Sequence, residues 1–151
     1  MTSQLNVDTI VDKAGSGGTN VKIGNTSTFV SDGGAVTQNT VQGITKNWCR
    51  LDQYDGTDIR DSFNTSSYTD IGTGEQLLSY ANNMSNALYS LVGTPHYGGS
   101  ANDMGTVGWQ SDGNLLTSSY RIYTFFAINS GSAFSLYDVE ECMTQVNGDL
   151  A

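Results

Sequence analysis

The sequence has little of what several functional classes require. Its 151 residues include two cysteines, one histidine and one proline, and six cations stand against fifteen carboxylates, for a net charge of −9. Zinc sites use three or four Cys or His ligands, commonly in closely spaced pairs, so the sequence predicts no metal centre and no cofactor. A chain this acidic has no basic stripe to follow a phosphate backbone or to attract anionic lipid. No apolar run approaches the roughly 20 residues of a membrane span. We therefore expect neither nucleic-acid binding nor membrane insertion.

Glycine is abundant, with 18 residues, and turn-forming Asn and Asp residues recur along the chain. From residue 44 onward, short runs rich in aromatic and β-branched residues alternate with these turn signals, at roughly the 8–12-residue spacing of an antiparallel sandwich. This pattern predicts an all-β head over residues 44–151, a jelly-roll-like β-sandwich without a long helix. The expected strands cover residues 44–54, 59–64, 68–71, 75–80, 84–92, 107–110, 120–128 and 134–146, and a long polar loop covers residues 94–105.

Residues 1–43 form an extension with a different composition. Its apolar side chains, among them Leu5, Val7, Val21 and Ile23, alternate with polar neighbours, which predicts short half-buried strands. The segment has too few apolar side chains to cover these faces by itself. We expect other copies of the chain or a partner to cover them. A disordered tail, and packing of the segment on its own head, remain alternatives.

Several motifs resemble those of virion structural proteins. Residues 3–12 (SQLNVDTIVD) and 17–24 (GGTNVKIG) resemble the N-terminal segment of tail-fibre and capsid-fibre proteins of tailed bacteriophages, particularly marine cyanophages and pelagiphages. The likeness continues at residues 60–64 (RDSFN), 69–74 (TDIGTG), 84–89 (MSNALY) and 148–151 (GDLA). One departure lies at residues 75–79 (EQLLS), where such heads commonly carry an alternating aromatic strand.

The resemblance implies a homotrimeric fibre, in which a slender β shaft is completed by trimerisation and carries the sandwich head. The unpartnered Leu5, Val7, Val21 and Ile23 then become candidates for the trimer core. The 151 residues hold no long virion-anchoring domain, so both direct attachment to a capsid and attachment through another fibre protein stay open.

Two groups of carboxylates could carry chemistry. Asp52, Asp55, Asp58 and Asp61 recur every third residue, and a calcium loop is conceivable, but the spacing differs from the Asp-x-Asp-x-Asp-Gly pattern. We expect solvated turn carboxylates. Glycoside hydrolysis needs two converging carboxylates, whereas the adjacent pair at residues 140 and 141 should point to opposite faces of one strand. The sequence thus predicts no catalytic residue, and we expect a protein that is not an enzyme.

Recognition chemistry gathers between residues 96 and 112. Tyr97 and Trp109 can stack on sugar rings, and His96, Asn102 and Asp103 offer hydrogen bonds beside them. Loops on a rigid sandwich commonly carry binding residues, so these five are the candidate receptor contacts. Placement of Trp109 in the core is the alternative.

The two cysteines, Cys49 and Cys142, are expected on the first and last strands of the head. These strands are often neighbours when a sandwich closes. The opening residues Met1 to Gln4 lack the basic and apolar regions of a secretory signal, which indicates synthesis in a reducing cytoplasm. We therefore expect both cysteines to be buried thiols.

These observations predict a non-enzymatic virion protein assembled in the host cytoplasm. In this interpretation it is a homotrimeric tail or capsid fibre whose head attaches to a host surface glycan or protein. The N-terminal segment would bind other virion proteins, such as the capsid, the tail or a fibre adaptor. A capsid decoration or cement protein without a receptor, and a small carbohydrate-binding module, are the alternatives.

Overall fold

The computed structural model describes residues 28–30, 37–54, 58–96, 104–109, 112–127 and 134–150. The chain divides into two compact units, Met1–Val41 and Gln42–Ala151. In the first, strands β1 (Thr28–Val30) and β2 (Thr37–Asn39) pair antiparallel. The short helix α1 (Thr40–Gly43) contains the division between the two units. The trimer-core candidates Leu5, Val7, Val21 and Ile23 lie outside the described residues. No helix of the described part is long and apolar enough to cross a membrane.

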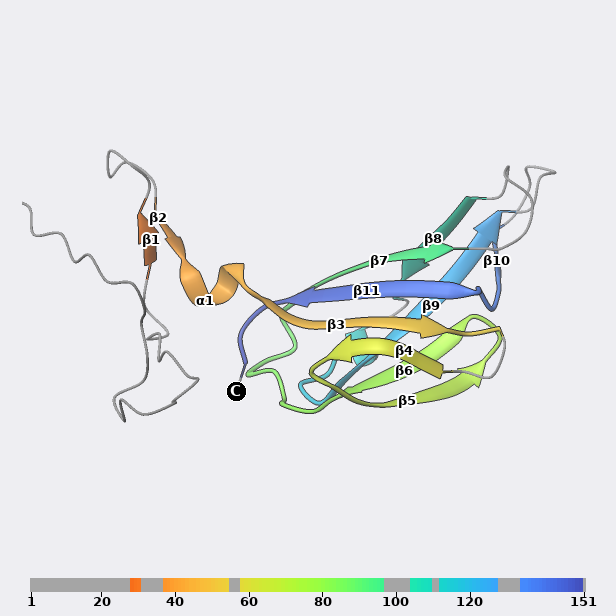
Figure 1. The fold of residues 1–151 in the computed structure, drawn as a ribbon, viewed down its shortest axis with the longest axis horizontal. Coiled ribbons are helices and arrows are strands. Elements are labelled where there is room, and N and C mark those ends of the chain that lie inside the picture. The colour runs from red at the N-terminus through yellow and green to blue at the C-terminus, as the bar shows by residue number, and fades with distance from the viewer. Residues whose placement is uncertain are drawn as a thin grey trace, which may run out of the picture. The chain divides into compact units, whose positions relative to one another are not determined.

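The second unit consists of two antiparallel sheets (Figure 1). The first, called the β3 sheet, has four strands in the order β4-β3-β11-β7. The second, called the β9 sheet, has five strands in the order β10-β9-β6-β5, with β8 also paired to β9. The elements are β3 (Thr45–Asp52), β4 (Asp58–Phe63), β5 (Thr65–Gly72), β6 (Glu75–Tyr80), β7 (Ser90–His96), β8 (Met104–Gly108), the 3-10 turn η1 (Asp112–Asn114), β9 (Ser119–Ala127), β10 (Phe134–Leu136) and β11 (Glu141–Asn147).

One core lies between the two sheets, because alternate residues of each strand point inward. Cys49 and Leu51 of β3 share a buried cluster with Leu78 of β6 and with Tyr120 and Ile122 of β9. The predicted all-β, antiparallel two-sheet architecture is thereby confirmed. β6 confirms the strand expected at residues 75–80, where the sequence departs from the fibre-head pattern.

The strand predicted at residues 84–92 is wrong over most of its length. Met84 makes only an isolated bridge to Leu150, and the strand begins at Ser90. The Asn86 side chain accepts the N–H of Leu88 at 2.8 Å, which folds the backbone into a turn instead of a strand.

The polar loop predicted from residue 94 is also wrong at its start, because Thr94, Pro95 and His96 belong to β7. Pro95 is tolerated there because β7 is the edge strand of the β3 sheet.

The single strand predicted over residues 134–146 is divided between the two sheets. β10 pairs with β9, whereas β11 pairs with β3 and β7. The buried side chain of Gln53 holds the crossing: its Oε1 accepts the Val139 N–H at 3.0 Å, and its Nε2 donates to Gln76 at 2.5 Å. The Val139 N–H and the Gln76 side-chain oxygen are thus satisfied by a side chain far away in sequence, which local alternation cannot indicate.

Both cysteines are buried free thiols on neighbouring strands, as predicted. The register places Cys142 opposite Leu51 and Cys49 opposite Thr144, so the two thiols lie diagonally on the inner face. Burial raises the pKa of Cys49 to about 11 and that of Cys142 to about 12. Both sulfur atoms therefore act as small apolar groups at neutral pH.

Replacing Tyr120 by phenylalanine should destabilise the head by about 1–3 kcal/mol. The fully buried Tyr120 hydroxyl donates to Asn47 Oδ1 at 2.9 Å and lies 2.8 Å from Thr144 Oγ1. Its removal therefore leaves two buried polar groups without this hydrogen-bond partner. Tyr68→Phe is the matched control, because the Tyr68 hydroxyl has no hydrogen-bond partner among the described residues. Urea unfolding measures both variants. Equal losses would contradict the assigned role of the Tyr120 hydroxyl.

Candidate functional site

The predicted receptor contacts do not form one surface. Tyr97, Asn102 and Asp103 lie outside the described residues. His96 ends β7, whereas Trp109 follows β8 and lies beside Leu88, just before β7 begins. Six residue steps of about 3.3 Å therefore place the two candidates at opposite ends of β7, roughly 20 Å apart. Each belongs to a different hollow.

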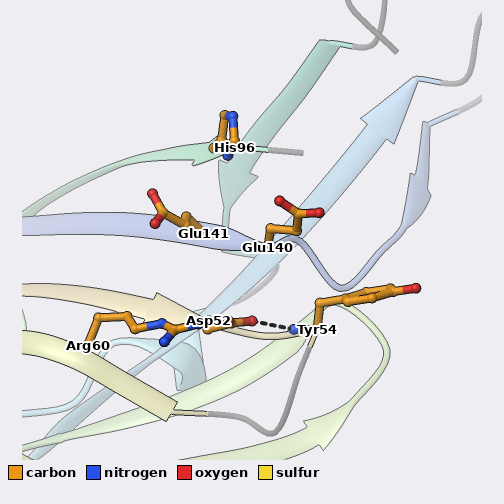
Figure 2. Close-up of a pocket in the computed structure, with 6 residues that line it drawn as sticks. All are labelled: Asp52, Tyr54, Arg60, His96, Glu140 and Glu141. Atoms are coloured by element: carbon orange, nitrogen blue, oxygen red, sulfur yellow. Dashed lines mark hydrogen bonds and ion pairs between the residues drawn. The ribbon is translucent and has the colours of Figure 1, made fainter. Parts of the chain in front are cut away.

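His96 lines a polar hollow of about 380 Å³ on the β3 sheet, here called the charged hollow (Figure 2). Strand register builds it, since Glu141 pairs with His96, and Asp52 stands next to the Leu51–Cys142 pair. Its lining residues are Asp52, Tyr54, Arg60, His96, Glu140 and Glu141.

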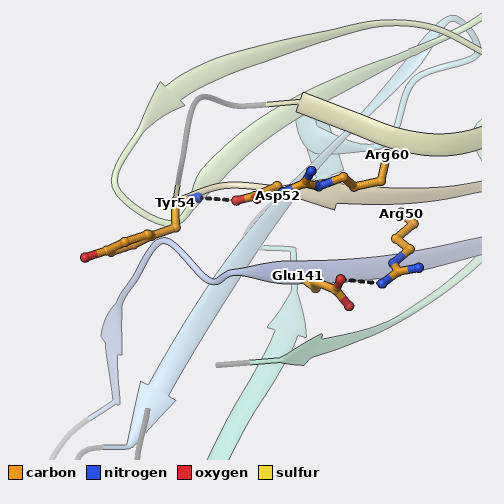
Figure 3. A network of polar contacts seen from close by, with 5 residues as sticks. All are labelled: Arg50, Asp52, Tyr54, Arg60 and Glu141. Carbon is orange, nitrogen blue, oxygen red and sulfur yellow. Dashed lines mark hydrogen bonds and ion pairs between the residues drawn. The ribbon is translucent and has the colours of Figure 1, made fainter. Parts of the chain in front are cut away.

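Two ion pairs hold two of the three carboxylates that line the charged hollow. Arg50 pairs with Glu141, and Arg60 pairs with the nearly buried carboxylate of Asp52 (Figure 3). Asp52 also accepts the backbone N–H of Tyr54 at 2.9 Å and raises the pKa of the Arg60 guanidinium. Both carboxylates are thereby oriented as fixed hydrogen-bond acceptors.

The expectation that Glu140 and Glu141 face apart is wrong. β11 begins at Glu141, and Glu140 lies in the bend before it, so strand alternation does not separate them. Both carboxylates line the charged hollow (Figure 2). Arg50 orients the Glu141 carboxylate and Arg60 orients the Asp52 carboxylate. The charged hollow therefore presents oriented hydrogen-bond acceptors, which suit a polar ligand.

Asp52, Asp58 and Asp61 do not assemble a calcium loop. Asp52 is committed to Arg60, whereas Asp58 and Asp61 are exposed on β4, and Asp55 lies outside the described residues. Among the described residues, no group of three or more His, Cys, Asp or Glu side chains is placed to hold a metal ion.

Trp109 lines a second hollow of about 330 Å³, here called the apolar hollow, together with Ala87, Leu88, Tyr89 and Leu115. Trp109 is 48% exposed and Leu88 is 91% exposed, so the alternative of Trp109 in the core is wrong. Tyr89 anchors the floor, because its hydroxyl lies 3.0 Å from the Leu116 carbonyl and 3.1 Å from that of Ser119. Sequence reasoning missed Leu88 because it assigned that residue to a strand.

The chain therefore contains an antiparallel two-sheet β domain. Its charged hollow and its apolar hollow lie near opposite ends of the edge strand β7. Comparisons of the chain with protein-family models, with curated proteins and with solved structures found no match.

Proposed function

We propose that the chain is a non-enzymatic structural protein of a tailed-phage virion, a homotrimeric tail or capsid fibre whose head attaches to the host surface. The apolar hollow is the observation that carries the attachment role. It presents a half-exposed indole and a nearly fully exposed leucine on a floor fixed by hydrogen bonds. Aromatic anchors on rigid supports dominate recognition energies, whereas an inert surface has no need of such a recess.

In this proposal, residues 1–43 form a short β shaft that trimerisation completes, and the head is a jelly-roll-like sandwich. The alternating apolar residues of the extension and its motif resemblance to phage fibres support the shaft. The division of the chain near residue 41 is consistent with a separate attachment segment. Through that segment the fibre binds a capsid, tail or adaptor protein of the virion.

A carbohydrate-binding role is the second candidate, and the charged hollow favours it. The ring of Tyr54 is 62% exposed and stands beside the oriented Asp52 carboxylate. An aromatic face with planar polar groups at its edge suits a sugar ring. This role is compatible with host attachment through a surface glycan.

Immunogold labelling of purified virions tests the location. We expect label at the capsid or tail, and the chain should be present at a fixed copy number in virions washed free of lysate. A protein found only in the lysate, and never on particles, would overturn the proposal. Label without any effect of head variants on adsorption would favour a decoration or cement protein.

Trp109→Ala should weaken adsorption to host cells about thirtyfold, which corresponds to the roughly 2 kcal/mol lost when an aromatic anchor is truncated. The melting temperature of the head should change little, because Trp109 is half exposed. Ile71→Ala is the matched control, since Ile71 is a similarly exposed apolar residue on β5 outside both hollows. Normal adsorption by virions carrying Trp109→Ala would show that the contact lies elsewhere.

A further inference from the structure

The outward side chains of the β3 sheet form ordered rows across four strands. Trp48 of β3 is directly opposite Phe63 of β4 on one side and Gln145 of β11 on the other, and Gln145 is opposite Val92 of β7. In the next row, Met143 of β11 is opposite Arg50. Four of these side chains are large, apolar and exposed, and they are here called the apolar row: Trp48, Phe63, Val92 and Met143.

Within the apolar row, Trp48 and Phe63 are direct cross-strand neighbours, and Met143 lies diagonal to both Trp48 and Val92, with Gln145 between those two. Phe63 is 51% exposed and Val92 is 57% exposed, although they sit on the two outer strands of the same sheet. On the β9 sheet, the exposed Ile71 and Leu136 lie on β5 and β10, at opposite ends of the strand order, so they form no row. Exposed apolar side chains gathered on neighbouring strands of one face are typical of an interaction surface.

Charge on this face is nearly balanced in an otherwise acidic chain. The four strands of the β3 sheet carry three of the chain's six cations, at Lys46, Arg50 and Arg60, but only four of its fifteen carboxylates. Two of those carboxylates are already neutralised by Arg50 and Arg60. Copies of a chain with a net charge of −9 repel one another, so they can approach only through a face with compensated charge.

Chain order connects this face to the extension. β3 starts two residues after α1, and the exposed Ile44 lies between them. Copies joined through residues 1–43 would therefore bring the first strand of each head close together. The charged hollow lies at the far end of β3, where it would form the polar rim of such a contact.

The outer face of the β3 sheet is too small to hold two copies together by itself, so the copies would also need to be joined through residues 1–43. The four strands have six to eight residues, rise about 3.4 Å per residue and stand about 4.8 Å apart, so together they present roughly 450 Å². Stable interfaces bury about 800 Å² on each partner. The face alone falls short of this area, and the extension would supply the remainder.

We propose that the outer face of the β3 sheet packs against another copy of this chain, with the apolar row at the centre of the contact. This inference rests on the homotrimer of the proposed function and identifies which face of the head turns toward the threefold axis. The β9 sheet and the apolar hollow then remain free for the host.

Single-tryptophan fluorescence of the full chain tests the proposal, because Trp48 and Trp109 are its two tryptophans. In a Trp109→Phe background, Trp48 reports whether the apolar row is covered. Sedimentation equilibrium gives the number of copies in the same sample. We expect a trimer in which acrylamide quenches Trp48 at least fivefold less efficiently than it quenches free tryptophan. Val92→Glu should restore quenching, whereas the matched control Ile71→Glu should not.

The outcomes separate this inference from the proposed trimer. A trimer in which Trp48 is fully quenched overturns the inference and leaves the trimer standing. A folded monomer overturns both, and protection of Trp48 in that monomer shows that the extension covers the face in cis.

Cross-linking identifies which residues cover the apolar row in the trimer. A photo-reactive phenylalanine analogue replaces Phe63 in a mixture of light and heavy isotope-labelled chains. Cross-links between light and heavy chains that end in residues 44–151 support the inference, and cross-links that end only in residues 1–43 overturn it.

Discussion

Gly74→Ala is expected to destabilise the head by about 3 kcal/mol or more. Gly74 has φ +66°, where an L side chain costs about 1–2 kcal/mol. A Cβ there would stand 2.6 Å from the Tyr137 nitrogen and 2.7 Å from the Thr124 oxygen, which are both backbone atoms and cannot swing aside. Overpacking adds about 1–3 kcal/mol. The turn between β5 and β6 sits against the end of β10, at Leu136 and Tyr137, and its Gly74 carbonyl accepts the N–H of Thr124 on β9 at 2.8 Å.

Gly72→Ala in the same turn is the matched control. A Cβ on Gly72 would meet nothing within 4 Å, so this variant should unfold within about 0.5 kcal/mol of the parent. Urea titration of both variants, with circular dichroism as the probe, gives the two differences. A Gly74→Ala head as stable as Gly72→Ala would mean that the close approach of β10 to this turn does not hold in solution.

The free energy of unfolding should fall steeply once the pH rises above about 9. Burial raises the pKa of Cys142 to about 12 and that of Cys49 to about 11, from the ordinary value of 9.0. Burial likewise raises the pKa of Tyr120 above its ordinary value of 10.0. Between these values the unfolded chain loses protons that the folded chain keeps. Ionisation therefore favours unfolding, and each such group contributes a slope of up to about 1.4 kcal/mol per pH unit.

Urea unfolding at a series of pH values from 7 to 11 measures this slope. Stability should be nearly flat up to about pH 8, fall first through the thiols, and fall faster above pH 10 as the buried tyrosines contribute. Cys142→Ala should lower the slope between pH 9 and 11 by about 1.4 kcal/mol per unit, whatever its own effect at pH 7. A parent protein whose stability stays constant to pH 11 would contradict the burial of these groups.

Local alternation was sufficient to predict much of the head. The runs that became β3, β6 and β9 have apolar positions two residues apart, and a half-buried strand needs no other information. The neighbouring buried cysteines followed from the same pattern and from the closure of a sandwich. The strand predictions failed where a side chain, in place of a neighbouring strand, accepts a backbone N–H hydrogen bond. Asn86 turns the chain before β7, and Gln53 holds the crossing between β10 and β11.

By itself, the sequence determined the all-β class and the alternating inner faces, because period-two patterning acts over a few residues. Tertiary structure alone decided which side chains meet. It separated His96 from Trp109 by the length of β7, brought Glu140 and Glu141 into one hollow, and aligned Trp48 with Phe63 across two strands. These placements depend on strand register and sheet order, which are set by pairings between residues far apart in sequence.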